Sequence, residues 1–173
     1  MSIHIIIDGY NLIRQSTTLS RLDHKDIILG RDGLVDMLAV YRKKKPHRIT
    51  VVFDGHHGPA FSPTQDRKKG IAIRFSRRGE SADDVIKRMA LKEREKALVV
   101  SSDLEIVNSV AAYGAATIST ALFEAKIGMA VQIDGPKSED EDHPGWTPTT
   151  KKRGPSRRLS KKQRRNRMKI NKL

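Results

Sequence analysis

Cysteine is absent from this sequence of 173 residues. Without thiols the chain has no disulfide framework and no thiolate metal site. No apolar run approaches the ~20 residues that a membrane-spanning helix needs. The N-terminus also lacks the charged, apolar and small-residue pattern of a signal peptide. We therefore expect a cytoplasmic protein with no membrane partner, long enough for one domain with a sizeable core.

Acidic residues are absent from residues 151–173, which hold 12 of the 34 Lys and Arg residues of the chain. Residues 1–150 hold the other 22 cations and all 20 acids, so this part is nearly neutral. Such a one-sign tail is typical of a polyanion-binding arm that self-repulsion keeps extended and disordered. An acidic membrane would also attract it, but the tail lacks an apolar helical face. The candidate RNA-binding residues of the tail are Lys151, Lys152, Arg153, Arg157, Arg158, Arg164 and Arg165.

Short apolar runs alternate with helical periodicity up to about residue 127. The runs are rich in Val and Ile, as strands buried on both faces are. This alternation predicts a doubly wound α/β domain over residues 1–130. Residues 131–150 are rich in Pro, Gly and acids and have no periodicity, which indicates a linker before the basic tail of residues 151–173. The five expected strands are residues 3–7, 49–53, 71–75, 97–101 and 115–118, with helices expected at 31–44, 82–95 and 104–113.

Several carboxylates are predicted at one edge of this sheet. Asp8, Asp54 and Asp103 follow expected strands, and Asp83 and Asp84 open an expected helix. Each acid alone has a structural explanation, because Asp-Gly forms turns and Asp and Ser cap helices. Together, however, uncompensated carboxylates repel one another and raise one another's pKa. An oxygen-only cluster of this kind suits Mg²⁺ or Mn²⁺, which can promote phosphodiester hydrolysis.

A second basic segment lies beside these acids in the sequence. It surrounds the expected strand at residues 71–75, and its cations are either solvated or part of a substrate-binding surface. Phosphate-cradling loops of the G-x-x-x-x-G-K-[S/T] or G-x-G-x-x-G type are missing, which disfavours a nucleotide-binding or phosphotransfer domain. The candidate RNA-binding residues of this segment are Arg67, Lys68, Lys69, Arg74, Arg77 and Arg78.

Four motifs in order, "IDGYN", "VVFDGH", "ESADDVI" and "VVSSD", resemble those of the YacP-like NYN domain family, relatives of the PIN-domain ribonucleases. The resemblance implies a PIN-like, Rossmannoid three-layer α/β/α fold with a central, mostly parallel five-stranded sheet. It also implies a metal-dependent endoribonuclease. The linker and tail are not part of the motif pattern. The implied catalytic residues are Asp8, Asn11, Asp83 and Asp103, and the implied metal ligands are Asp8, Asp83, Asp103, Asp54 and Asp84.

Two functions remain open on the sequence alone. The first is a Mg²⁺- or Mn²⁺-dependent endoribonuclease in which Asn11 orients water or binds a phosphate, rather than merely capping a helix. The second is a non-catalytic RNA-binding or ribosome-associated module with the same fold. In both cases the partner is RNA, either ribosomal RNA or translated mRNA, and the oligomeric state is open. Removal of the chain beyond residue 150 is expected to weaken RNA binding and spare the chemistry.

Overall fold

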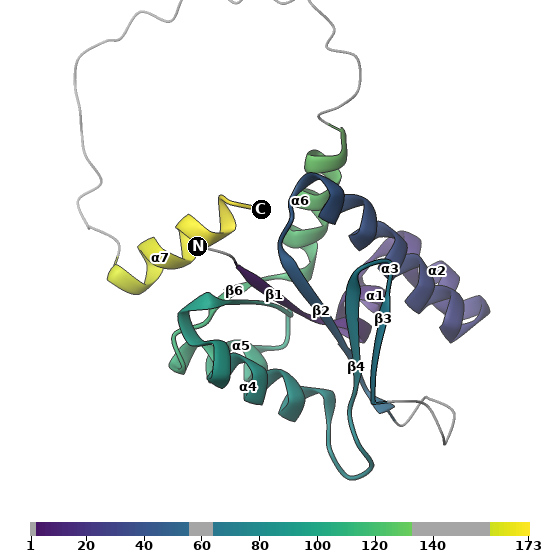
Figure 1. The fold of residues 1–173 in the computed structure, drawn as a ribbon, viewed down its shortest axis with the longest axis horizontal. Coiled ribbons are helices and arrows are strands. Elements are labelled where there is room, and N and C mark those ends of the chain that lie inside the picture. The colour runs from purple at the N-terminus through teal and green to yellow at the C-terminus, as the bar shows by residue number, and fades with distance from the viewer. Residues whose placement is uncertain (1–2, 56–63, 133–159) are drawn as a thin grey trace, which may run out of the picture.

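The computed structural model describes residues 3–55, 64–132 and 160–173. Its centre is a six-stranded sheet with the order β3-β4-β2-β1-β5-β6 (Figure 1). All neighbouring strands are parallel except the pair β3 and β4. The strands are β1 (His4–Asp8), β2 (Arg48–Phe53), β3 (Gln65–Lys68), β4 (Ile71–Phe75), β5 (Ala97–Val100) and β6 (Ala116–Ile118).

The helices cover the sheet on two faces, so the predicted three-layer α/β/α architecture is confirmed (Figure 1). α1, α3 and α6 pack on one face, with α2 against α3, while α4 and α5 pack on the other. The helices are α1 (Gly9–Gln15), α2 (Thr17–Lys25), α3 (Ile27–Lys44), α4 (Ala82–Glu93), α5 (Leu104–Ala112), α6 (Thr120–Gln132) and α7 (Lys161–Ile170), with a 3₁₀ turn η2 (Arg94–Lys96).

The five expected strands are present as β1, β2, β4, β5 and β6, but the sheet has a sixth strand that the sequence did not predict. β3 has the sequence Gln-Asp-Arg-Lys and lies at the edge of the sheet, antiparallel to β4. Its exposed side chains leave no apolar alternation to read. The backbone of β4 supplies its hydrogen bonds, and a polar, charged edge strand also resists pairing with another chain.

The expectation of a disordered tail is wrong for residues 160–173, which contain α7 (Figure 1). Ser160 and Gln163 form a capping box at its start. The Asn166 side chain bonds both backbone groups of Thr117 on edge strand β6, accepting from its N–H at 2.9 Å and donating to its carbonyl at 3.3 Å. Leu173 is only 6% exposed. Residues 151–159 lie outside the described part of the chain.

The order of the strands places a switch point where ligands of such sheets usually bind. From β1 the chain adds β2 and β4 on one side, then returns to add β5 and β6 on the other. The switch in strand order therefore lies between β1 and β5, and ligands of open α/β sheets bind outside the carboxyl ends of the strands at such a point. Asp8 ends β1 and Asp103 follows β5, so both lie at this point. Among the described helices, none is long and apolar enough to cross a membrane.

Candidate functional site

Asp8 is a buried carboxylate at the end of the central strand β1. Ile6 packs with the α4–α5 layer, so Asp8, two residues later, lies on the same face of the sheet. Its Oδ1 accepts the Asn11 backbone N–H (3.3 Å), and its Oδ2 accepts the Ser101 hydroxyl (3.0 Å). Burial raises the pKa of Asp8 from 3.8 to about 6; these two hydrogen bonds oppose the rise, and the charges of Asp83 and Asp103 add to it.

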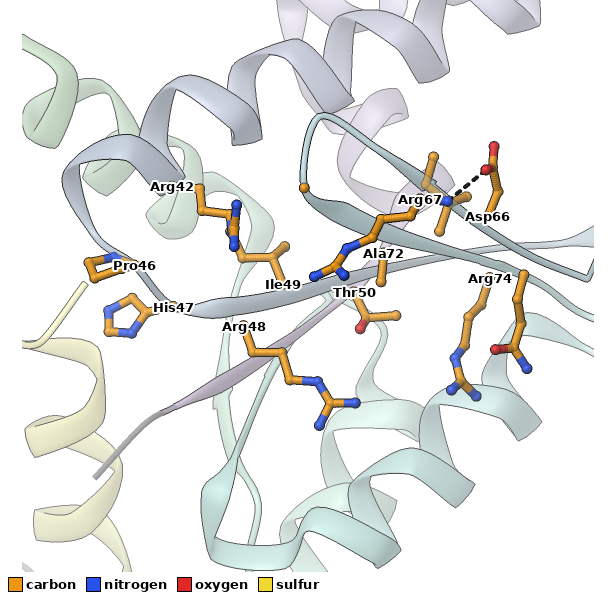
Figure 2. Close-up of a pocket in the computed structure, with 13 residues that line it drawn as sticks. Arg42, Pro46, His47, Arg48, Ile49, Thr50, Asp66, Arg67, Ala72 and Arg74 are labelled. Carbon is orange, nitrogen blue, oxygen red and sulfur yellow. Dashed lines mark hydrogen bonds between the residues drawn. The ribbon is translucent and has the colours of Figure 1, made fainter.

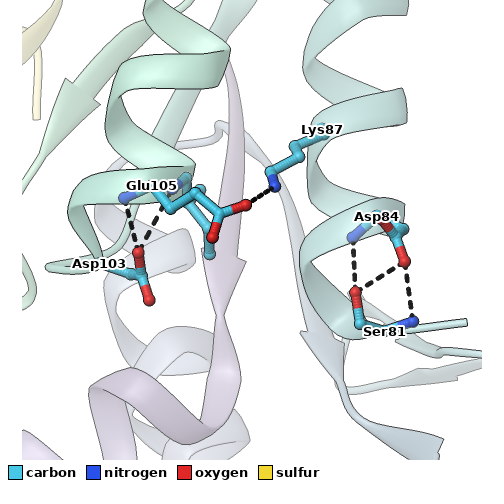
Figure 3. A network of polar contacts seen from close by, with 6 residues as sticks. Ser81, Asp84, Lys87, Asp103 and Glu105 are labelled. Atoms are coloured by element: carbon cyan, nitrogen blue, oxygen red, sulfur yellow. Dashed lines mark hydrogen bonds and ion pairs between the residues drawn. The ribbon is translucent and has the colours of Figure 1, made fainter.

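Asp83 and Asp103 approach the same edge from α4 and α5. Asp83 lies in the first turn of α4. Asp103 is the N-cap of α5 and accepts the N–H groups of Glu105 (2.7 Å) and Ile106 (3.4 Å). Burial and then the charge of Asp103 raise the pKa of Asp83, whereas Lys87 lowers it. Lys87 also donates to Glu105 at 2.6 Å and so links the two helices (Figure 3). The structure thus brings together three of the predicted acids.

Asp84 belongs to the cap of α4 rather than to this group. Its Oδ2 accepts the Ser81 N–H (3.1 Å) and the Ser81 hydroxyl (2.8 Å), while Ser81 accepts the Asp84 N–H (Figure 3). This is a capping box in which Asp takes the place of Glu. The hydrogen bonds from Ser81 lower the pKa of Asp84. The local structure therefore accounts for Asp84 fully as a capping residue.

Asp54 follows β2, which neighbours β1 on the side away from β5 and Asp103. Its Oδ1 accepts the Ser76 hydroxyl at 3.4 Å, and Ser76 in turn accepts the Gly55 N–H at 2.9 Å. The negative charge of Asp54 acts on Tyr10, whereas the acids that raise the pKa of Asp8 are Asp83 and Asp103. Asp54 thus lies at the edge of the sheet, where it accepts a hydrogen bond from Ser76.

A network of hydrogen bonds fixes Asn11 and the loop after β5. The Asn11 Oδ1 accepts the Ser102 N–H (3.0 Å) and the Gln15 amide (3.2 Å). Ser101, 1% exposed, donates to Asp8 and accepts the Asp103 N–H at 3.1 Å. The alternative that Asn11 caps the helix is wrong, because Asp8 is the N-cap of α1. Asn11 ties α1 to the β5 loop through its carbonyl, and no described residue accepts from its Nδ2 amino group, which can therefore donate to a ligand.

The donor chemistry at this edge fits a hard divalent cation. Asp8, Asp83 and Asp103 offer only carboxylate oxygens, the ligands that Mg²⁺ and Mn²⁺ prefer. Within residues 3–55, 64–132 and 160–173, however, no three His, Asp or Glu side chains lie close enough together to hold a metal ion. The charges of the three acids influence one another, but the acids do not form a complete coordination site. Binding of an ion would require their carboxylates to move closer together.

The structure divides the predicted RNA-binding residues into groups. Lys68 and Lys69 pair with Asp32 (2.7 Å) and Asp36 (2.5 Å) of α3. Arg67 and Arg74 line a hollow on the face of the sheet that carries α4 (Figure 2). Arg77 and Arg78 are exposed in the turn before α4, and Arg164 and Arg165 are exposed on α7. The remaining candidates lie outside the described residues: Lys151, Lys152, Arg153, Arg157 and Arg158.

Sequence reasoning missed three basic residues beside these surfaces. Lys87 stands one helical turn after Asp83, and this i, i+4 spacing is the signal that could have placed it next to the acids. Arg42 and Arg48 line the same hollow as Arg67 and Arg74. Arg42 belongs to α3 and Arg48 to β2, so only the folded chain brings these cations together.

Comparison with known proteins agrees with the geometry. The family model of the YacP-like NYN domain matches residues 5–172. The chain belongs to the YacP-like NYN domain family. The match includes residues 131–172, which the motif pattern had left out. Membership of this family implies a PIN-like, nuclease-type and RNA-related function.

Relatives of this NYN domain include a bacterial protein with crystal structures. Over 86 residues the chain is 29% identical to the uncharacterized protein YacP of Bacillus subtilis (strain 168), and the match spans 50% of each protein. The crystal structure of Rae1 (YacP) from Bacillus subtilis aligns with a TM-score of 0.64 at 25% identity, covering 77% of each chain. A point mutant of Rae1 aligns with the same TM-score at 22% identity, covering 76% of this chain and 78% of the mutant.

Proposed function

We propose that this chain is a Mg²⁺- or Mn²⁺-dependent endoribonuclease that hydrolyses RNA phosphodiester bonds. The observation that carries the proposal is the placement of Asp8. It is a buried carboxylate at the switch point, without a cationic partner in the described part of the chain, and two further acids act on its charge. Keeping such a group ionised is costly unless a cation joins it, which supports a metal site.

Asp8, Asp83 and Asp103 are the proposed metal ligands. A divalent cation held there supplies Lewis-acid activation of water and stabilises charge on the phosphate. The Ser101 hydroxyl keeps Asp8 oriented and favours its ionised form. The Asn11 amino group donates to a phosphate oxygen, because its carbonyl is held by Ser102. Asp54 and Asp84 are not ligands in this proposal.

α7 and the preceding tail are the proposed docking arm for ribosomal RNA or translated mRNA. Arg165 of α7 pairs with Glu95, and Lys169 donates to the Ala97 carbonyl at 3.4 Å. The other cations of α7 are exposed and have no ion-pair partner among the described residues, which suits them to phosphates. They are Lys161, Lys162, Arg164 and Arg167.

One observation favours the alternative of a non-catalytic RNA-binding module. Asp8 caps α1, Asp103 caps α5 and Asp84 belongs to the cap of α4, so each has a structural use. Metal binding separates the two functions without reference to activity. Mn²⁺ should raise the melting temperature of the wild-type protein, because a ligand that binds only the folded state stabilises it. Mn²⁺ should leave the melting temperature of the Asp8→Asn protein unchanged. An equal rise in both proteins would contradict the proposal that Asp8 is a metal ligand.

Activity is tested by incubating the full chain with total RNA in Mn²⁺, Mg²⁺ or EDTA. The proposal predicts internal cuts with either metal and none with EDTA, because the proposed metal supplies the activation of water and the charge stabilisation at the phosphate. Mapping the cut ends would identify the substrate. Intact RNA under all three conditions, from a protein that binds RNA, would favour the non-catalytic alternative.

A further inference from the structure

One part of the sheet face that carries α4 is left open. α4 packs over β1 and β5 and reaches β2. Beyond it, over β2, β4 and β3, lies a hollow of about 730 Å³ (Figure 2). The floor is low because Thr50 and Ala72 are small and lie side by side in neighbouring strands. The bulky residues of β4, Ile71 and Ile73, belong to the core on the opposite face.

Four arginines surround this floor, and we call them the arginine groove: Arg42, Arg48, Arg67 and Arg74. They come from four different elements, α3, β2, β3 and β4. Arg67 on β3 pairs directly with Ala72 on β4, and Arg74 lies two residues after Ala72 on β4. Arg42 reaches across from α3 and lies against Gly70 in the β3–β4 turn, where an added Cβ would meet its guanidinium.

The positive charge of this groove is poorly balanced. Arg48 pairs with Glu93 at 3.2 Å, but Arg42, Arg67 and Arg74 have no ion-pair partner within the described ranges. The one acid in its lining, Asp66, accepts the backbone N–H of Arg67 at 2.6 Å. Protection of an edge strand explains a cation on β3. It does not explain cations on the interior strands β2 and β4, so a ligand of negative charge is the better account.

The groove leads toward the candidate active site. Gln65 and Arg74 also line a second hollow of about 350 Å³, together with Arg77 and Arg88. Glu80 in this second hollow is paired with Arg88. The hollow borders the first turns of α4, the helix that carries Asp83. The cations therefore form a strip from the start of β2 to the edge where the carboxylates gather.

We propose that the arginine groove binds the phosphate backbone of a single RNA strand next to the bond that is cut. This inference rests on the proposed function, because the groove matters for cleavage only if the carboxylate edge cuts RNA. The lining comes from the end of α3, the α3–β2 connection, β2 and the β3–β4 hairpin. This hollow is assigned to one strand, whereas a rigid duplex needs a broad surface for both backbones. The lining has no Phe, Tyr or Trp, and its single aromatic ring is that of His47, so we assign the groove contacts with phosphates rather than selection of bases.

The test compares two pairs of charge removals on the same hairpin. Arg67→Gln with Arg74→Gln removes two of the four groove arginines. Lys68→Gln with Lys69→Gln removes the same charge from two predicted RNA-binding residues that do not line the groove and are already paired with Asp32 and Asp36 of α3. Binding of a labelled single-stranded RNA is measured by fluorescence anisotropy in the Asp8→Asn background, where the RNA stays intact. The groove pair should weaken binding about tenfold, and the control pair less than about twofold.

Salt titration and a charge-preserving variant sharpen this test. The slope of log affinity against log salt should fall by about 0.7 for each phosphate of the single strand that the variant no longer neutralises. Arg67→Lys with Arg74→Lys should restore most of the binding, which separates lost charge from misfolding. If the groove pair and the control pair weaken RNA binding equally, or if neither weakens it, the proposal that the groove binds RNA is wrong. Competition by an unlabelled duplex as strong as that by the single strand would overturn the single-strand assignment.

Failure of the groove and failure of the proposed function give different results. If the wild-type protein makes metal-dependent cuts and the groove pair still binds and cuts normally, the groove is wrong and the enzyme stands. If the groove pair alone loses RNA binding while no condition yields cuts, the groove stands as an RNA site and the enzyme is wrong.

Discussion

At the scale of single residues, Asp8 shows a conflict between stability and the proposed chemistry. Burial raises its pKa to about 6, so folding at neutral pH forces an ionised carboxylate into a site that disfavours it. A pKa raised from 3.8 to about 6 corresponds to about 3 kcal/mol of lost stability at pH values above both. Such a cost is typical of residues kept for function rather than for folding.

Asp8→Asn should therefore stabilise the metal-free protein. The amide keeps an acceptor for the Asn11 N–H and has no charge to bury. In EDTA at about pH 8 we expect a gain of about 1–3 kcal/mol in the free energy of unfolding. Below the unfolded pKa of 3.8 both states bind the proton, so the gain should vanish there. Urea unfolding at several pH values measures it, and a variant less stable than the wild type at pH 8 would contradict the burial argument.

Ser101→Ala should shift the pH dependence of cleavage. The Ser101 hydroxyl bond lowers the pKa of Asp8, so its loss lets that pKa rise further. Because Asp8 must be ionised to bind a metal, the acidic limb of the pH–rate profile should move upward by about one unit. Ser102→Ala is the matched control, since its hydroxyl bonds Thr120 and not Asp8. An unchanged profile for Ser101→Ala would show that this bond does not tune Asp8.

At the scale of elements, the start of α4 gives its two neighbouring acids different roles: Asp84 caps the helix, and Asp83 is a proposed metal ligand. Asp84→Ala should break the capping box and lower the melting temperature of the protein. It should leave metal-dependent cleavage within about threefold of the wild type, because the Asp84 carboxylate is bound to Ser81. Thermal unfolding and cleavage rates measure both effects. A loss of cleavage as large as that of Asp83→Asn would return Asp84 to the metal ligands.

α7 is an integral element, so truncation is a poor test of RNA binding. The Asn166 amide bonds the N–H and carbonyl of Thr117 on edge strand β6, and Leu173 is buried with its carbonyl accepting the Tyr41 hydroxyl at 3.3 Å. The expectation that the chain can be cut after residue 150 without effect on the chemistry neglects these contacts. Substituting the exposed cations of α7 is the cleaner experiment.

Asn166→Ala should destabilise the protein by about 1–2 kcal/mol, because it leaves both edge groups of Thr117 without their partner. Asn171→Ala is the control, since Asn171 is exposed at the end of the same helix. Thermal unfolding compares the two variants. Equal stability of Asn166→Ala and the wild type would mean that α7 does not dock on β6 in solution.

The sequence predicted the elements whose signal is local. β1, β2, β4, β5 and β6 are apolar runs, and α3, α4 and α5 have helical periodicity, so pattern alone locates them. β3 and α7 were missed because neither has an apolar pattern of its own, and both are held by contacts with distant segments. The ranges of α1, α2 and α6 were not predicted either. The tail was judged by its self-repulsion alone, whereas Ile170 and Leu173 give it an apolar anchor.

The candidate site was predictable only in part. Strand ends and helix starts placed Asp8, Asp83 and Asp103 at one edge, because the carboxyl ends of parallel strands meet there. The spacing of Ser81 and Asp84 indicated a capping box, which the structure confirms. The sequence could not show which neighbouring groups donate hydrogen bonds to each carboxylate oxygen. Nor could it show that the Ser101 hydroxyl is already used by Asp8 and Asp103. Those facts depend on side-chain directions that only the packed helices fix.

At the scale of the whole molecule, opposite charges are segregated. Residues 1–150 are nearly neutral, with 22 cations and 20 acids. Nevertheless three coupled acids meet at the switch point between β1 and β5, while four arginines gather over β2, β4 and β3. An RNA backbone attracted by the cations and a cation attracted by the acids are the two partners that this division suits.

The most direct measurement of this account is cleavage of a defined single-stranded RNA with Mn²⁺ by the wild type, Asp8→Asn and Asp84→Ala. The account predicts cutting by the wild type and Asp84→Ala, and at least about a thousandfold slower cutting by Asp8→Asn with RNA binding retained. Cutting by folded Asp8→Asn protein at the wild-type rate would contradict the central claim that Asp8 holds the catalytic metal.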